Sequence, residues 1–211
     1  DAWFADFDGG GSSPDMILAR VTCRTPQELR QFLDKVKNYE TQELGLWAKR
    51  FLLLGDDEYL GDPSKKESSI HIEGCERIAP LAGNQLDLVK VYLTEYPLEA
   101  IKSKPKAEAE LLRQLNLGAL FWCFFGHGAG FQLCHERAFN VEDIPLVRNG
   151  SRNPLAFFGS CGVGRFDDTK YEAIAEELVR SAAGCIATIG ASKATYSGSN
   201  ENFARKLFTH L

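Results

Sequence analysis

The sequence predicts an α/β fold with a mostly parallel central sheet flanked by helices. Short apolar runs of strand length recur along the chain, for example RFLLLG at 50–55 and LFWCFF at 120–125. Segments whose apolar residues repeat at helical spacing separate these runs. Strands that alternate with helices are typical of parallel sheets, because each helix carries the chain back to the start of the next strand. The 211 residues suit one domain with its own hydrophobic core.

The first predicted elements are a loop, a strand and a helix. Residues 1–15 mix aromatics, aspartates and glycines, as irregular loops do. MILARVT at 16–22 predicts a short strand. TPQE at 25–28 is a capping box with proline at the first helical position, and it predicts an amphipathic helix over 26–40.

The later elements continue the alternation of strands and helices. Strands are predicted at 50–55, 87–95, 120–125, 154–159 and 184–192. Helices are predicted at 72–83 with Pro80 near the end, from Pro105 onward, at 171–182, and over 200–211 with Ser199 as the cap. Residues 132–153 between two of the strands read as a long loop.

Composition excludes several classes of protein. A net charge of −5 is unlike that of a nucleic-acid-binding surface, which carries clustered Lys and Arg. No apolar run reaches the length of a membrane span. The six cysteines show no CxxC pair and no regular spacing, so a zinc cage is not expected, and the redox compartment stays open. The chain starts with Asp1 rather than Met, so we expect residues 1–211 to be a mature or excised piece of a longer protein.

Two apolar runs end in a reactive side chain between glycines. The first ends in GHG, with His127 at its centre, and the second ends in GSCG, with Cys161. Parallel strands bring their carboxyl ends to one edge of a sheet, where open α/β sheets bind ligands. An imidazole beside a thiol is the arrangement that a cysteine nucleophile needs, because the thiolate is the attacking species. The backbone N–H groups of Gly128 and Cys161 are candidates for an oxyanion hole.

With these motifs in view, the sequence resembles the caspase-like cysteine peptidases, and among them the gingipains and the related sortase of the type IX secretion system. The matching segments run nearly the whole length: residues 15–40, 50–58, 115–130, 135–137 and 160–168. The resemblance implies a three-layer caspase-like fold and endopeptidase or transpeptidase chemistry through a Cys-His dyad, with no cofactor required for catalysis. It also implies a polypeptide substrate, contacts with further domains of a longer protein, and a secreted, periplasmic or cell-surface location.

The resemblance assigns roles to particular residues. Cys161 becomes the nucleophile and His127 the general base and acid. An acidic side chain at the end of an earlier strand orients the histidine in gingipains, which makes Asp57 the best candidate here, with Asp56 one residue away. The competing interpretation is that both aspartates are only a polar strand end.

The resemblance weakens in the substrate pocket. Arginine-specific gingipains place an acidic residue in the loop after the acidic strand end, and the aligned position here is Ser69, with Glu67 the nearest carboxylate. A preference for basic side chains is therefore not implied. Tyr196 stands where family members place bulky side chains of the pocket wall.

The N-terminal aspartates form a possible calcium site. Asp6, Asp8 and Asp15 offer the carboxylate oxygens that calcium prefers, although a solvated turn would have the same composition. Known gingipains bind calcium structurally, which favours the ion.

Rival interpretations stay open. His135 and Glu136 form a second possible pair of catalytic histidine and orienting carboxylate, but they lack the strand-end glycines. An esterase of the α/β-hydrolase type is disfavoured because Val163 stands where the nucleophile elbow needs glycine. The serious alternative is an inactive caspase-like binding or scaffold domain.

Overall fold

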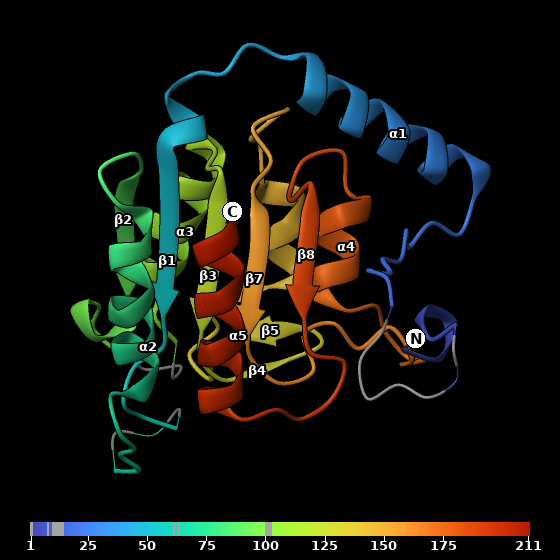
Figure 1. The fold of residues 1–211 in the computed structure, drawn as a ribbon. Helices are drawn as coiled ribbons and strands as arrows, with labels where there is room; N and C mark the ends of the chain where they lie inside the picture. Colours follow the sequence, from blue (N-terminus) through green and yellow to red (C-terminus); the bar gives the residue numbers. More distant parts are fainter. Residues whose placement is uncertain (1, 8, 10–14, 61, 63, 100–102) are drawn as a thin grey trace.

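A five-stranded parallel sheet forms the centre of the protein (Figure 1). The computed structural model describes residues 2–7, 9, 15–60, 62, 64–99 and 103–211. The strand order is β2-β1-β3-β7-β8. The strands are β1 (Arg50–Gly55), β2 (Asp87–Tyr92), β3 (Phe121–Phe125), β7 (Leu155–Gly159) and β8 (Ala187–Gly190). The predicted parallel sheet is confirmed.

Helices cover both faces of the sheet, which gives the three predicted layers (Figure 1). The helices are α1 (Pro26–Thr41), α2 (Ile70–Ile78), α3 (Pro105–Leu117), α4 (Ile174–Arg180) and α5 (Ser197–His210). Alternate residues of each strand point to opposite faces, so Leu52 and Trp122 pack with α3 and α4, whereas Phe51 and Phe157 pack with α2 and α5. A parallel sheet buried on both faces explains why the strands read as continuous apolar runs.

Short elements complete the fold. The 3₁₀ helices are η1 (Ala2–Ala5), η2 (Leu46–Lys49), η3 (Ala79–Ala82), η4 (Leu93–Glu95) and η5 (Val141–Leu146). A small antiparallel sheet follows β3 and consists of β4 (Gly128–Ala129), β5 (Gln132–Leu133) and β6 (Phe139–Asn140). This sheet occupies part of the segment that was predicted to be a loop.

The predicted strand at 16–22 is wrong. These residues form no ladder with any strand in the part of the chain that the structure describes, and Ile17 is 96% exposed. A short apolar segment forms a strand only where a neighbouring strand accepts its hydrogen bonds. The segment instead runs as an extended connection into α1.

The helix predictions are confirmed with shifted ends. Thr25 and Glu28 form the predicted capping box of α1. The helix predicted at 72–83 begins earlier, at Ile70, and passes into 3₁₀ geometry around Pro80. The predicted cap at Ser199 is wrong, because α5 already begins at residue 197.

The described residues contain no disulfide and no helix that could span a membrane. Each of the six cysteines is a free thiol. None of the described helices has the length and apolar character that crossing a bilayer requires.

Candidate active site

The two glycine-flanked motifs meet at the carboxyl end of the sheet. Strands β3 and β7 are direct neighbours, with Phe125 opposite Gly159. His127 and Cys161 each follow two residues after this pair, so both leave the sheet at the same edge. Gly128 packs directly against Ser160, where a Cβ atom would collide with the serine hydroxyl. A glycine is therefore required at 128 to bring the histidine loop against the cysteine loop.

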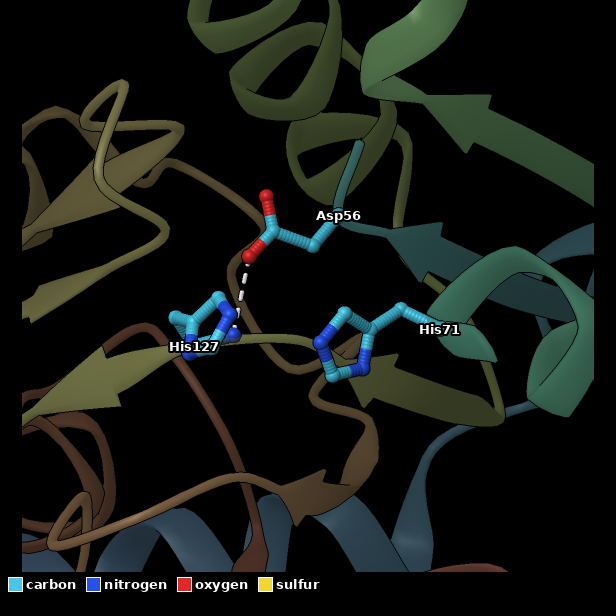
Figure 2. Close-up of side chains that lie close together, drawn as sticks. All are labelled: Asp56, His71 and His127. Carbon is cyan, nitrogen blue, oxygen red and sulfur yellow. Dashed lines mark hydrogen bonds between the residues drawn. The ribbon is translucent and has the colours of Figure 1, made fainter. Parts of the chain in front are cut away.

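His127 is held by two carboxylates. Its Nε2 atom lies 2.8 Å from Oε1 of Glu67, which comes from the loop before α2. Its backbone N–H donates to Oδ2 of Asp56 over 2.8 Å, at the end of β1 (Figure 2). The imidazole is 36% exposed, so it is anchored on one side and open to solvent on the other. Glu67 is the side chain that contacts the ring.

Asp57, which was predicted to orient the ring of His127, pairs with a different residue. Its carboxylate Oδ2 lies 2.5 Å from the ammonium of Lys104, and its Oδ1 accepts the backbone N–H of Tyr59. Both Asp57 and Lys104 are buried, and a buried carboxylate requires a close partner of opposite charge. This ion pair at the strand end engages Asp57, while the neighbouring Asp56 faces His127.

Two further histidines flank the catalytic candidate. The ring centroids of His71 and His127 are 5.1 Å apart, and those of His127 and His135 are 4.7 Å apart. Burial and the neighbouring His127 lower the pKa of both His71 and His135. His135, the predicted rival, therefore lies beside His127 rather than in its place.

The carboxyl end of β1 is an electrostatically strained environment. Burial raises the pKa of Asp56 to about 7, and Glu136 adds to the rise, whereas the hydrogen bond from the His127 backbone opposes it. Side-chain oxygens of Asp56, Asp57 and Glu136 lie within 4.8 Å of one another. Glu136 is buried in this group, and the ammonium of Lys104 supplies positive charge at Asp57.

Cys161 is half-buried and held by the loop after β8. Its sulfur accepts a hydrogen bond from the backbone N–H of Thr195 at 3.4 Å and donates to the Thr195 carbonyl at 3.5 Å. The Thr195 hydroxyl donates to Oδ1 of Asn200 in α5 over 2.9 Å. Gly162 has a φ of 65°, which lets the chain turn immediately after the thiol. No pattern in the sequence pointed to Thr195 or Asn200.

A cleft of about 170 Å³ opens beside the thiol. It is lined by Gly128, Ala129, Gly130, Cys161, Gly162, Arg165, Tyr171 and Ala194. Glycines and alanines make up most of the lining, so few large side chains fill the cleft. Arg165 also lines it, and its guanidinium lies 3.6 Å from the carboxylate of Asp168. The cleft offers open space directly next to Cys161.

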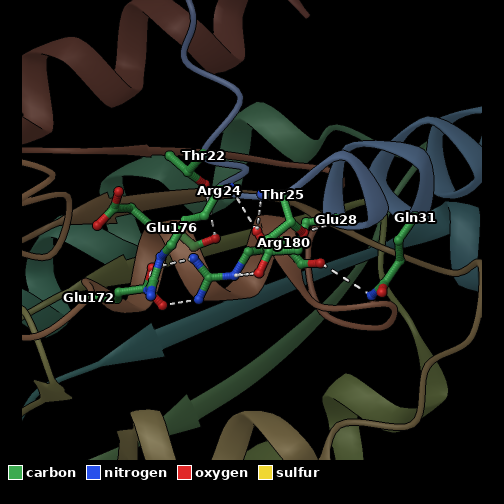
Figure 3. Close-up of polar contacts among 8 residues, drawn as sticks. All are labelled: Thr22, Arg24, Thr25, Glu28, Gln31, Glu172, Glu176 and Arg180. Atoms are coloured by element: carbon green, nitrogen blue, oxygen red, sulfur yellow. Dashed lines mark hydrogen bonds and ion pairs between the residues drawn. The ribbon is translucent and has the colours of Figure 1, made fainter.

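Polar contacts tie one wall of the cleft to the N-terminal part of the chain. Glu172, one residue after Tyr171, forms ion pairs with Arg24 and Arg180 (Figure 3). Arg180 also approaches Glu28 of α1 at 3.7 Å. These contacts fix the start of α4 and with it the segment that follows Cys161.

The other predicted residues lie further from the dyad candidates. The Ser69 hydroxyl donates to Glu73 over 2.6 Å at the start of α2, and Tyr196 follows Thr195 with 83% of its surface exposed. Carboxylates of Asp6 and Asp15 accept the backbone N–H groups of Gly9 and Phe7, respectively. Asp8 lies outside the described residues, and calcium binding there stays a prediction.

Comparisons with known proteins agree with this architecture. The family model described as peptidase family C25 matches residues 1–211. Among solved structures, the chain is similar to the Arg-specific cysteine proteinase gingipain R (TM-score 0.78, 19% identity, 100% of this chain and 49% of that chain). It is also similar to the complex of Porphyromonas gingivalis RgpB pro- and mature domains (TM-score 0.77, 17% identity, 99% and 48%). A third similar solved chain is described as a protease (TM-score 0.74, 20% identity, 97% of this chain and 42% of that chain).

These similarities establish the fold over the length of this chain. At such identities the solved structures show a shared fold, and the chain spans about half their length. No curated protein matches the sequence.

Proposed function

The chain belongs to peptidase family C25, and from that premise we propose that it is a cysteine peptidase in which Cys161 attacks the substrate and His127 moves the proton. The observation that carries the proposal is the meeting of the two strand-end motifs, in register on neighbouring strands and beside one cleft. The substrate is a polypeptide, as membership of a peptidase family implies.

Glu67 sets the protonation pattern of His127 in this proposal. A carboxylate hydrogen-bonded to Nε2 favours a proton on that nitrogen, which leaves the lone pair on Nδ1. Nδ1 is then the atom that accepts the thiol proton. The imidazolium that forms is stabilised by the negative charge of Glu67, and the thiolate receives the N–H of Thr195.

Cleavage then follows the acyl-enzyme route. The thiolate attacks the carbonyl carbon, and the oxyanion accepts the backbone N–H groups of Gly128 and Cys161. The C–N bond breaks as His127 protonates the departing amine, which leaves a thioester on Cys161. Water, deprotonated by His127, releases the acid. A second amine in place of water would give transpeptidation.

Every step uses a thiol, an imidazole, a carboxylate and backbone N–H groups of this chain, so the proposed chemistry requires no cofactor. The calcium predicted near Asp6 and Asp15 would act on the structure of the N-terminal loop. Export from the cell and contacts with further domains belong to the proposal through the family resemblance alone.

A peptidyl probe with a thiol-reactive warhead tests the dyad. We expect labelling of Cys161, shown by mass spectrometry, to be abolished in Cys161→Ala and to fall at least about 100-fold in rate in His127→Ala, because the base is lost. His135→Ala is the matched control, since it removes the imidazole on the other side of the cluster.

The outcome separates the two functional classes. Labelling that is equal in wild type and His127→Ala would favour the inactive binding or scaffold domain. Product analysis with an added amine then separates hydrolysis from transpeptidation in an active protein.

A further inference from the structure

A second set of side chains surrounds His127 on the side of β1 and α2. Asp56 ends β1, His71 lies in the first turn of α2, and His127 follows β3 (Figure 2). Each offers one ligand atom, and these three atoms all lie within 4.8 Å of one another. The proposed peptidase mechanism uses the imidazole of His127 and gives the imidazole of His71 no role.

The donor set matches a borderline transition metal. Two imidazole nitrogens and one carboxylate oxygen are the ligands that Zn²⁺ prefers in sites with three protein ligands. Zinc bonds of about 2.0–2.2 Å place tetrahedral ligands about 3.3–3.6 Å apart, so side-chain movements of about 1–1.5 Å would close the set around an ion. His71 and Asp56 are buried, which limits competition from water.

Glu67 lies beside this group. Its Oε1 atom is 2.8 Å from Nε2 of His127 and 3.6 Å from Nε2 of His71, so one carboxylate contacts both imidazoles. Its negative charge next to the group favours a divalent cation there.

We propose that Asp56, His71 and His127 form a Zn²⁺ site whose occupation switches off His127. A neutral imidazole has one lone pair and one N–H. A metal that takes the lone pair at either nitrogen leaves only the N–H, so the ring can no longer accept the proton of Cys161. The zinc-bound protein is therefore the inactive form, and a chelator restores the base. The switch rests on the proposed function, whereas metal binding does not.

The neighbouring acidic group is a different case. Asp56, Asp57 and Glu136 also bring their oxygens within 4.8 Å of one another. There, however, the ammonium of Lys104 lies 2.5 Å from Asp57 and already supplies a cation. The pair of histidines therefore distinguishes the proposed site.

Metal binding is tested without catalysis. The reduced protein is titrated at pH 8 with Zn²⁺ by calorimetry and with Co²⁺ by visible absorption, which reports ligand number and type. We expect one ion per chain and a tetrahedral Co²⁺ spectrum without the charge-transfer band of a thiolate ligand. His71→Gln should weaken Zn²⁺ binding at least about 100-fold, because loss of a direct ligand costs more than the 10–100-fold seen for outer partners.

Two variants serve as controls. His135→Gln removes the imidazole on the opposite side of His127 and should bind Zn²⁺ with wild-type affinity. Cys161→Ala should also retain binding. Equal losses in His71→Gln and His135→Gln, or loss of binding in Cys161→Ala, would overturn the assignment.

The switch has its own readout. The peptidase activity of each variant is normalised to its activity with chelator. Zn²⁺ should inhibit wild type and His135→Gln. Inhibition of His71→Gln should need a Zn²⁺ concentration at least about 100-fold higher. If activity is absent without zinc, the proposed function fails while the binding arm still decides the metal site. If Zn²⁺ binds and active wild type is not inhibited, the switch is wrong.

Discussion

Replacing Glu67 by glutamine tests whether its charge supports His127 during catalysis. The glutamine keeps the size of the side chain and an oxygen that can accept from Nε2, but it loses the negative charge opposite the imidazolium. A hydrogen bond to a charged group contributes about 1.5–3 kcal/mol. Glu67 is 23% exposed and His127 is 36% exposed, so water screens part of this interaction and the lower end applies.

The structure therefore gives a defined magnitude. A loss of about 1.5–2 kcal/mol of transition-state stabilisation lowers kcat/KM about 10- to 30-fold, at 1.36 kcal/mol per factor of ten. Glu67→Ala, which also loses the hydrogen bond, should be slower again.

The assay is kcat/KM for a fluorogenic peptide measured across pH, with circular dichroism to check folding. Glu73→Gln is the matched control: Glu73 lies on α2, is exposed, and bonds to Ser69 and Arg77 rather than to the dyad. If kcat/KM of Glu67→Gln stays within about twofold of wild type, or if Glu73→Gln loses as much, the role of Glu67 is refuted.

Three further outcomes follow from the same contacts. Lys104→Met leaves the buried Asp57 without its cation and should lower the free energy of unfolding by about 3–5 kcal/mol in urea titration. Exposed Lys66→Met is the control and should leave the unfolding midpoint unchanged; equal effects would contradict the prediction. Burial lowers the pKa of Lys35 to about 8, so above pH 8 the folded chain releases a proton that the unfolded chain still holds. The stability of wild type relative to Lys35→Met should therefore rise by up to about 1.4 kcal/mol per pH unit until about pH 10; a flat difference would contradict it. Arg165 is the cation among the cleft residues, so Arg165→Gln should lower kcat/KM about tenfold for peptides with an acidic residue at the cleaved bond and leave neutral peptides unchanged; parallel losses would exclude a specificity role.

The pH prediction for Lys35 also bears on how α1 is attached. Its ammonium donates to the carbonyls of Ser181 and Cys185 over 2.8 and 2.9 Å, and also to those of Leu178 and Val179. These are carbonyls at and after the C-terminal end of α4, where a cation is favourable. A lysine on an otherwise amphipathic helix gives no sequence sign of this role.

The positions of His127 and Cys161 could be predicted because both residues follow buried strands. Neighbouring parallel strands end at the same edge of the sheet. Once β3 and β7 are known to be buried strands, the residues two positions past their ends must leave at one edge, and His127 and Cys161 do so. The sequence also predicted a carboxylate near His127 just after β1, and Asp56 accepts the His127 backbone N–H there. The sequence favoured Asp57 over Asp56, whereas the Asp57 carboxylate pairs with Lys104, which lies 47 residues further along the chain and gives no signal in the strand pattern.

The contacts that Glu67 and Thr195 make with the site could not be predicted from the sequence. Glu67 and Thr195 lie in segments without periodicity, and their positions depend on how each loop packs rather than on a repeating backbone geometry. The predicted strand at 16–22 failed for a related reason: the segment is apolar, but no strand among the described residues pairs with it.

The two loop contacts act on different members of the proposed dyad and favour the same step. Glu67 places a carboxylate on Nε2 of His127, opposite the charge that the ring carries after it takes the thiol proton. Thr195 bonds Cys161 in both of its states: its carbonyl accepts from the thiol, whereas its N–H donates to the sulfur and becomes the stronger contact once the thiolate forms. Proton transfer from sulfur to imidazole therefore loses the hydrogen bond to the Thr195 carbonyl and strengthens the two that remain, at the Thr195 N–H and at Glu67. The sheet brings the reacting groups to one edge, and the loops favour the charged pair that attacks the peptide.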